Sequence, residues 1–285
     1  MIAQAQISKL SNRLFKGQGG RRIPDLVLER DYCIAWFLVG LSRTPLREKL
    51  IFKGGTALKR CHYAEYRFSE DMDFTLPEEL TFDALKAHLE RVYDEVKRAS
   101  GIVFRFSRED TSTHQNCYTF YMGYDGPLSV TAMGKEIKVD ITLKECLVHA
   151  AEEKAVLRSY PEFEDLPENA KVRVYSLAEI ASEKTVALLD RARTEPRDLF
   201  DLWHLSTVSK RVDLKEILHA VKQKLLFRGK TLDEVRGEFA KKEARLKKTW
   251  DGRLATQMGT LPEFEGVFRA VKRNLRQAEI TEDEK

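Results

Sequence analysis

The sequence predicts an α+β protein in which a half that mixes helices and strands, up to about residue 174, precedes a helical half. Alternating apolar and polar residues, which are typical of strands, are concentrated between residues 101 and 143, in GIVFRFSRE, NCYTFYMGY, LSVTA and EIKVDITL. From Ser176 onward the apolar residues instead recur at the three- and four-residue spacing of helices. We therefore expect two domains, residues 1–174 and 175–285.

The first half begins with helical spacing over residues 24–42. LIFKGGTALKR, residues 50–60, is a short apolar run, two glycines and the start of a helix, and SEDMDFTL, residues 69–76, alternates like a strand. Thr81 is placed to cap a helix. The apolar stripe of that helix comprises Phe82, Leu85, Leu89, Val92 and Val96.

The second half has clear helix boundaries. Ser176 and Glu179 have the spacing of a capping box, and the helix that they begin is expected to reach about Arg191. The following segment, RTEP, breaks the pattern, and a second helix is expected to start near Arg197, just after Pro196.

Composition limits the class of protein. An apolar fraction of 42% in 285 residues is enough for a folded core, and no apolar run approaches the roughly 20 residues of a membrane span. The four cysteines form no CxxC pair, which argues against a zinc site or a disulfide framework, and the N-terminus has no secretory apolar segment. We expect a cytoplasmic protein with no membrane partner.

Positive charge is concentrated late in the chain. Residues 210–276 contain twice as many Lys and Arg as Asp and Glu, and a short stripe within them could bind a polyanion. Since Glu238 and Glu243 are interspersed, a solvated helix face is the alternative interpretation. The stripe consists of Lys241, Lys242, Arg245, Lys247 and Lys248.

Asp71 and Asp73 are the first candidates for catalysis. Two residues apart on a strand, they point to the same face, whereas Met72 and Phe74 point to the other. Two carboxylates on one face favour a cation between them, and Mg²⁺ prefers such oxygen ligands. The alternative is an exposed acidic strand.

A glycine turn lies upstream of these aspartates. Lys53, Gly54, Gly55 and Thr56 stand between an apolar run and a helix start, about 15 residues before Asp71. Glycines let the backbone approach a ligand closely, and a helix start offers N–H groups to phosphate. This order of motifs predicts a nucleotide-binding turn, although an ordinary strand-to-helix turn would look the same.

Asp140 is the third candidate carboxylate. It lies on the polar face of the strand EIKVDITL, opposite Ile137, Val139 and Ile141. If that strand neighbours the one with Asp71 and Asp73, the three carboxylates converge, as in two-metal phosphoryl transfer. A polar residue on a half-exposed strand is the alternative.

The helical half adds Lys184, Asp198 and Asp201. Lys184 lies within the apolar stripe of its helix and therefore either reaches outward or has a buried partner, such as a triphosphate. Asp198 and Asp201, three apart, share a helix face and could orient Lys184, a base or a metal-bound water, or pair with nearby arginines. We expect His204 to be a packing or surface residue.

Three segments together resemble one family. FKGGTALKR, RFSEDMDFTL and SEKTVALLDRARTEPRDLFDLWHL, in this order, are similar to the AbiEii-type nucleotidyltransferase toxins, which include the MenT toxins and belong to the DNA polymerase β-like superfamily. The resemblance implies a polymerase β-like core with a mixed sheet and a helical C-terminal half that completes the active site. It also implies transfer of nucleotides from a nucleoside triphosphate to RNA, typically the tRNA 3′ acceptor end, which blocks translation. A divalent ion, Mg²⁺ or Mn²⁺, and a cognate antitoxin are implied as well.

The resemblance also assigns roles to residues. It places the family's serine and aspartates on Ser69, Asp71 and Asp73, and its lysine on Lys184. Its glycine motif falls on Gly54, Gly55 and Thr56, and its last aspartate on Asp198 or Asp201. Asp140 has weaker support. Two other functions stay open: a nucleotidyltransferase acting on a protein or small-molecule hydroxyl, and an inactive RNA- or partner-binding module.

Overall fold

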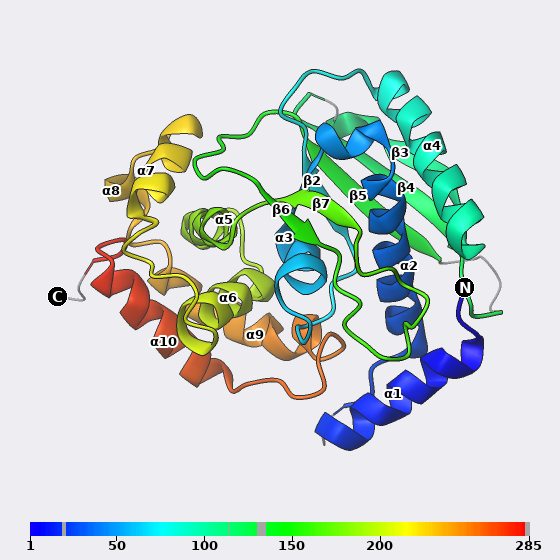
Figure 1. Ribbon diagram of the computed structural model, residues 1–285. Coiled ribbons are helices and arrows are strands. Elements are labelled where there is room, and N and C mark those ends of the chain that lie inside the picture. The colour runs from blue at the N-terminus through cyan, green and yellow to red at the C-terminus, as the bar shows by residue number, and fades with distance from the viewer. Residues whose placement is uncertain (19–20, 114, 130–134, 283–285) are drawn as a thin grey trace. The chain divides into compact units, whose positions relative to one another are not determined.

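The computed structural model describes residues 1–18, 21–113, 115–129 and 135–282 (Figure 1). Its internal contacts divide the chain into two units. The sheet unit comprises Met1–Glu145, Ala151–Val174 and Gln257–Gly259, and the helical unit comprises Cys146–Ala150, Tyr175–Thr256 and Thr260–Lys285.

A seven-stranded sheet organises the sheet unit. The strands lie in the order β3-β4-β5-β2-β1-β7-β6, with antiparallel pairs at both ends and parallel pairs between β2 and β5 and between β1 and β7. The expected mixed sheet is therefore confirmed. The strands are β1 (Ile51–Lys53), β2 (Met72–Thr75), β3 (Val103–Asp110), β4 (Cys117–Asp125), β5 (Glu136–Thr142), β6 (Glu152–Ala155) and β7 (Lys171–Val174).

The central strands bury their apolar faces. In β2, Met72 and Phe74 are almost completely buried, and the Phe74 ring lies 5.0 Å from that of Phe52 on β1. In β5, Ile137, Val139 and Ile141 are buried in the same alternating way. This alternation leaves the aspartates of β2 and β5 on the other side of the strand, half-buried.

The described part of the sheet unit contains four α-helices, and the two longest, α2 and α4, pack side by side (Figure 1). Thr81 caps the second of them as expected, because its hydroxyl accepts a hydrogen bond from the Ala84 backbone N–H at 3.3 Å. The helices are α1 (Gln4–Gln18), α2 (Asp25–Ser42), α3 (Gly54–Ala57) and α4 (Phe82–Ser100); a π-helical turn, Leu58–His62, continues α3.

Six α-helices lie among the described residues of the helical unit. An aromatic cluster forms part of its core: the rings of Phe264 and Phe268 stack on each other, Phe268 stacks on Phe239, and Trp250 meets Phe264 edge-on. The helices are α5 (Leu177–Leu189), α6 (Pro196–Trp203), α7 (Leu218–Phe227), α8 (Leu232–Val235), α9 (Glu243–Leu254) and α10 (Phe264–Gln277).

Strands β6 and β7 are not predicted by the sequence pattern. EEKA, at the edge of the sheet, is mostly charged and has no apolar alternation, and KVRV alternates over only four residues, which is too short to identify a strand. Conversely, Leu128 and Ser129 of the expected strand LSVTA lie outside any strand, and residues 130–132 fall outside the described residues.

The capping box at α5 is only half present. Ser176 accepts a hydrogen bond from the Glu179 backbone N–H at 3.2 Å, as expected. The Glu179 carboxylate, however, is completely buried, 2.7 Å from the Lys224 ammonium and 2.9 Å from the His149 backbone nitrogen. It is used to neutralise a buried lysine, and this tertiary demand outweighs the local capping preference.

Candidate active site

A glycine turn at the end of β1 faces the first aspartate strand. Gly54 follows Lys53 with φ of +79°, a conformation that side chains rarely adopt. A Cβ at Gly54 would lie 2.4 Å from Oδ2 of Asp73. The glycine therefore does two things that no other residue could do here without strain: it turns the chain and admits a carboxylate against the backbone.

The second glycine admits an arginine. A Cβ at Gly55 would lie 2.5 Å from Nη2 of Arg67 and 3.3 Å from Oγ of Ser69. Arg67 is buried, and its Nη1 donates to Oε1 of Gln257 at 2.9 Å. Both glycines are thus required by the segment that carries Ser69 and Asp73, which brings the two sequence motifs into contact.

Thr56 and Lys53 support this turn. The Thr56 hydroxyl, which is fully buried, donates to the Asp71 carbonyl oxygen and so fixes the aspartate segment to α3. The Lys53 ammonium lies 3.4 Å from the Glu145 carboxylate, and both side chains are almost completely buried. The structure gives both residues positioning contacts, and their contact with a nucleotide stays a prediction.

The three candidate carboxylates occupy adjacent strands. Asp73 is paired with Asp140 in the parallel register of β2 and β5, and Asp71 directly precedes β2. The condition under which Asp140 was expected to join the pair is therefore met. Asp140, however, accepts hydrogen bonds from the Thr119 hydroxyl at 2.7 Å and from the Lys138 ammonium at 2.6 Å.

Lys138 supplies a positive charge inside this acidic group. Partial burial acts to lower the pKa of Lys138, but the hydrogen bond to Asp140 and the nearby charges of Asp140 and Asp71 outweigh it, and the pKa is raised. Among the residues that the structure describes, no three side chains form a group arranged to hold a metal ion. In this arrangement the Lys138 ammonium is bound to Asp140, and a role for Asp140 as the third metal ligand stays a prediction.

The remaining pair fits a single divalent ion. Asp71 and Asp73 are half-exposed, so that solvent reaches their carboxylates, and they are hard oxygen donors. Because Gly54 has no Cβ, the Asp73 carboxylate lies directly against the backbone of the turn. Two carboxylates with the remaining positions filled by water and phosphate oxygens is a common way to bind Mg²⁺.

The helical unit contains a second cluster, formed by Lys184, Asp198 and Asp201. The Lys184 ammonium lies 2.7 Å from Asp198 and 2.9 Å from Asp201, and Asp198 also accepts a hydrogen bond from Nε of Arg193 at 2.8 Å. Burial alone would raise the pKa of Asp198, but Lys184 and Arg193 outweigh it, and the pKa is lowered. Of the alternatives that the sequence left open, the structure thus shows two: both aspartates pair with Lys184, and Asp198 also pairs with Arg193.

His204 follows the same helix and agrees with a packing role. Its ring stacks on Phe200, and burial lowers its pKa although the nearby Asp201 acts to raise it. A histidine that is kept neutral in this way is a poor partner for a phosphate.

The prediction of an exposed basic stripe is wrong at Lys242. Lys242 is buried, and its ammonium donates to the carbonyl oxygens of Ala187, Asp190 and Arg193, where it caps the end of α5. Burial lowers its pKa to about 8. Of its neighbours, Lys241 lies 2.7 Å from Glu238 and Lys247 lies 2.5 Å from Glu265. A lysine beside the C-terminus of a helix can be a structural cap, and sequence alone does not distinguish it from a surface lysine.

Comparison with protein-family models decides the family. The model described as the nucleotidyl transferase AbiEii toxin of type IV toxin–antitoxin systems matches residues 36–273. The chain belongs to this AbiEii family. The family resemblance and the nucleotidyltransferase fold expected from the sequence are thereby confirmed, and the chain is a nucleotidyltransferase toxin of a toxin–antitoxin system.

Solved structures agree on the AbiEii fold. The nucleotidyltransferase toxin MenT4, Rv2826c from Mycobacterium tuberculosis H37Rv, is similar with a TM-score of 0.66 at 17% sequence identity, and the match covers 98% of this chain and 90% of MenT4. A comparison with curated proteins gave no significant match. None of the helices that the structure describes combines the length and the hydropathy that crossing a bilayer requires.

Arg67 is the main feature that sequence reasoning missed. It lies within the quoted motif RFSEDMDFTL, two residues before Ser69, and is the only positive charge of that motif. Its importance depends on contacts with Gly55 and with Gln257, which is 190 residues away in sequence. A charged residue directly before a catalytic motif is the signal that could have identified it.

Proposed function

We propose that this AbiEii toxin uses Mg²⁺ or Mn²⁺ to transfer nucleotides from a nucleoside triphosphate to RNA, at the 3′ acceptor end of tRNA, and thereby blocks translation. The observation that carries the proposal is the fit between Gly54 and Asp73. A glycine at a positive φ lets a carboxylate approach the backbone of the turn without strain. A nucleotide site would use this close approach, because a phosphate could then meet the turn and the carboxylate together.

Asp71 and Asp73 would hold the divalent ion. When bound, the ion neutralises the charge of the triphosphate and lowers the barrier to attack by a hydroxyl. The chain itself positions the ligands: Thr56 holds the Asp71 carbonyl oxygen, and β1 and β5 hold Asp73 between them. Binding of Asp140 to an ion would require Lys138 to release it, and this ligand stays a prediction.

The glycine turn would contact the nucleotide. Gly54 is only partly buried and has no side chain that would hinder a phosphate, whereas Gly55 is buried beside the Ser69 hydroxyl. Arg67 is buried against Gly55 and adds positive charge next to the turn. These residues supply binding and orientation, which are the protein's main contribution to phosphoryl transfer.

Lys184 is proposed to bind the triphosphate through its charge. Asp198 and Asp201 restrict its ammonium to one position, so that its orientation is set before a ligand arrives. Completion of the active site by the helical unit is part of this proposal. Both aspartates are candidates for a catalytic role, because each of them contacts Lys184.

RNA is supported as the acceptor by charge. The formal net charge is +4, and the excess of Lys and Arg lies in the helical half, which suits a polyanion. Since the family is that of toxins paired with antitoxins, a cognate antitoxin is the expected protein partner.

The test is incubation with each of the four labelled triphosphates and total tRNA. We expect label on the RNA in the presence of Mg²⁺ or Mn²⁺, none with a chelator, and none on tRNA whose 3′ terminal ribose has been oxidised with periodate. Label on protein or on a small molecule would indicate a different acceptor. Binding of RNA without label on any acceptor would indicate an inactive module.

A further inference from the structure

One face of α10 lines a basic groove. The groove has a volume of about 450 Å³ and lies entirely within the helical unit. Among the residues that the structure describes, five cations and one acidic residue, Glu282, line it. The cations are Arg236, Arg269, Lys272, Arg273 and Arg276.

The four cations of α10 lie along one side of the helix. Positions 269, 272, 273 and 276 have the three- and four-residue spacing that places side chains on one face. The opposite face is fixed in the core by Phe268, Val271 and Leu275, which are buried. From position 269 to position 276 the helix rises about 10 Å, which is enough to meet more than one phosphate of a single strand.

Much of this charge is available to a ligand. Within the described residues Arg273 forms no ion pair with a carboxylate, and the acidic side chain that Arg269 influences, Glu265, is itself paired with Lys247. Arg236 is partly committed: it lies 3.4 Å from Asp233 and donates to the Glu279 carbonyl oxygen. The described residues that line the groove therefore carry a net positive charge, and Arg269, Arg273 and Arg276 are exposed.

The chemistry of the groove favours a nucleic-acid backbone over an acidic protein. Its aromatic residue, Phe239, is 1% exposed and stacks on Phe268, so that no ring is offered to a base. None of the exposed large apolar side chains among the described residues lines it. Protein interfaces centre on such apolar and aromatic residues, whereas phosphate contacts need only cations.

We propose that this groove binds the sugar-phosphate backbone of the RNA acceptor without reading its sequence. The inference rests on the proposed function for the identity of the RNA, but not for the binding itself. It replaces the stripe around Lys242, which the structure assigns to helix capping. Binding is expected to be sensitive to salt, because each phosphate contact releases counterions.

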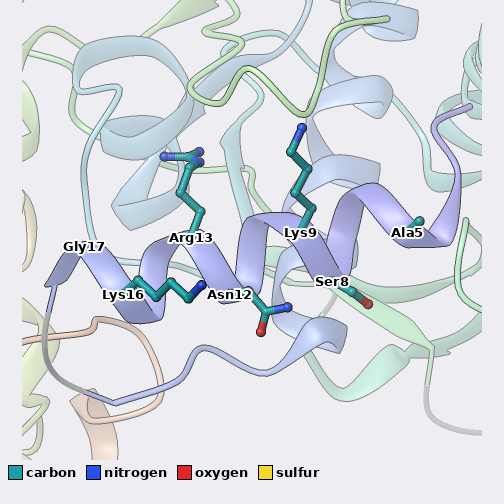
Figure 2. A pocket seen from close by; sticks show the side chains of 7 residues that line it. All are labelled: Ala5, Ser8, Lys9, Asn12, Arg13, Lys16 and Gly17. Carbon is teal, nitrogen blue, oxygen red and sulfur yellow. The ribbon is translucent and has the colours of Figure 1, made fainter.

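The hollow along α1 provides a matched control surface (Figure 2). Lys9 and Lys16 are exposed there, but Arg13 is committed to Glu162 through two hydrogen bonds of 2.8 and 2.7 Å. Figure 2 shows that Lys9 and Arg13 project from one side of α1, whereas Ser8 and Asn12 project from the other. The positive charge of α1 is thus smaller and lacks a continuous row.

The experiment compares two double variants that remove equal charge from exposed positions. Arg269→Gln with Arg273→Gln alters the groove, and Lys9→Gln with Lys16→Gln alters α1. Fluorescence anisotropy would measure binding of labelled tRNA and of an unrelated single-stranded RNA from about 50 to 200 mM salt. We expect the groove variant to bind both RNAs more weakly, with a plot of log affinity against log salt that is less steep by about 1–2, and the α1 variant to match the wild type.

The outcomes separate this proposal from the proposed function. The proposal that the groove binds RNA would be wrong if the two variants have equal RNA affinities and equal salt slopes. It would also be wrong if the wild type binds no RNA, even if nucleotide transfer is observed. Binding of poly-glutamate, a mimic of an acidic protein, would be measured in the same way. If the groove variant loses poly-glutamate binding but keeps its affinity for RNA, the groove binds an acidic protein and the proposal is wrong. If the groove variant loses RNA binding but no protein transfers nucleotides, the groove stands and the proposed function fails.

Discussion

In the sheet unit, Asp71 and Asp73 stand beside a glycine turn with half-exposed carboxylates, whereas in the helical unit Lys184, Asp198 and Asp201 form a nearly closed ionic cluster. The exposed fractions of these three side chains are 12%, 3% and 0%. In the first group a glycine with a positive φ lets a carboxylate lie against the backbone. In the second group oppositely charged side chains fill the space.

This difference separates two uses of charge. Buried charges that neutralise one another are needed for the fold, because removal of one leaves the others unpaired in a low-dielectric interior. Half-exposed carboxylates on a common face repel each other and contribute little to stability, but a cation from solvent can reach them. We therefore expect substitutions in the first group to affect activity, and substitutions in the second group to affect stability as well.

The largest expected effect is on activity in the sheet unit. Asp71→Ala should reduce nucleotide transfer by about 10³-fold or more, because it removes a proposed metal ligand. The melting temperature should stay the same or rise, since repulsion with Asp73 is relieved. Transfer assays and calorimetry would measure both, with Asp83→Ala, an exposed aspartate of α4, as the control.

The second prediction concerns Lys184. Lys184→Ala should lower the free energy of unfolding by about 3–5 kcal/mol, because the buried Asp201 loses the Lys184 ammonium and Asp198 keeps only Arg193. It should also weaken nucleotide binding. Lys184→Arg should recover part of the stability but not the activity, because the planar guanidinium has a different geometry. Urea unfolding and nucleotide titration would show this, and unchanged values for Lys184→Ala would refute the ionic cluster.

The third prediction compares two glycines with the same φ of +79°. Gly101→Ala should cost about 1–2 kcal/mol for the backbone alone, because nothing lies within 4 Å of its new Cβ. Gly54→Ala should cost about 2–4 kcal/mol, because the Cβ also displaces Asp73. Transfer activity should fall only in Gly54→Ala. Equal activity of the two variants would show that the turn does not position Asp73.

The smallest effect concerns two adjacent lysines. Lys242→Ala should destabilise the protein by about 1–2 kcal/mol, because carbonyl oxygens at the end of α5 lose their donor. Lys241→Ala, at an exposed residue, should leave the stability unchanged. Urea unfolding of both variants gives the comparison. If Lys242→Ala weakens RNA binding without loss of stability, the capping assignment is wrong.

Local signals predicted much of the fold. The run LIFKGGTALKR contains its own evidence of a strand, a turn and a helix, and the structure has all three between Ile51 and His62. The alternating residues of β5 likewise predicted which face is buried. Strands β6 and β7 could not be predicted, because their pairing partners, rather than their own four residues, make them strands.

The candidate site is less accessible to sequence reasoning for a similar reason. The position of Asp140 beside Asp73 was conditional on strand order, and its pairing with Lys138 depends on side-chain rotamers that no spacing rule specifies. The contact of Arg67 with Gln257 joins segments that are far apart in the chain. Spacing thus indicates which residues can share a face, but not which of them neutralise one another.

The most direct test of the central claim is Mn²⁺ binding measured by electron paramagnetic resonance in the presence of a nucleoside triphosphate. Wild type and Asp73→Asn would be compared at equal concentrations, with transfer to tRNA followed in the same samples. Our account predicts that the wild type binds Mn²⁺ and labels the RNA, whereas Asp73→Asn, folded and of similar shape, loses both. Unchanged Mn²⁺ affinity together with full transfer by Asp73→Asn would contradict the assignment of the metal to this site.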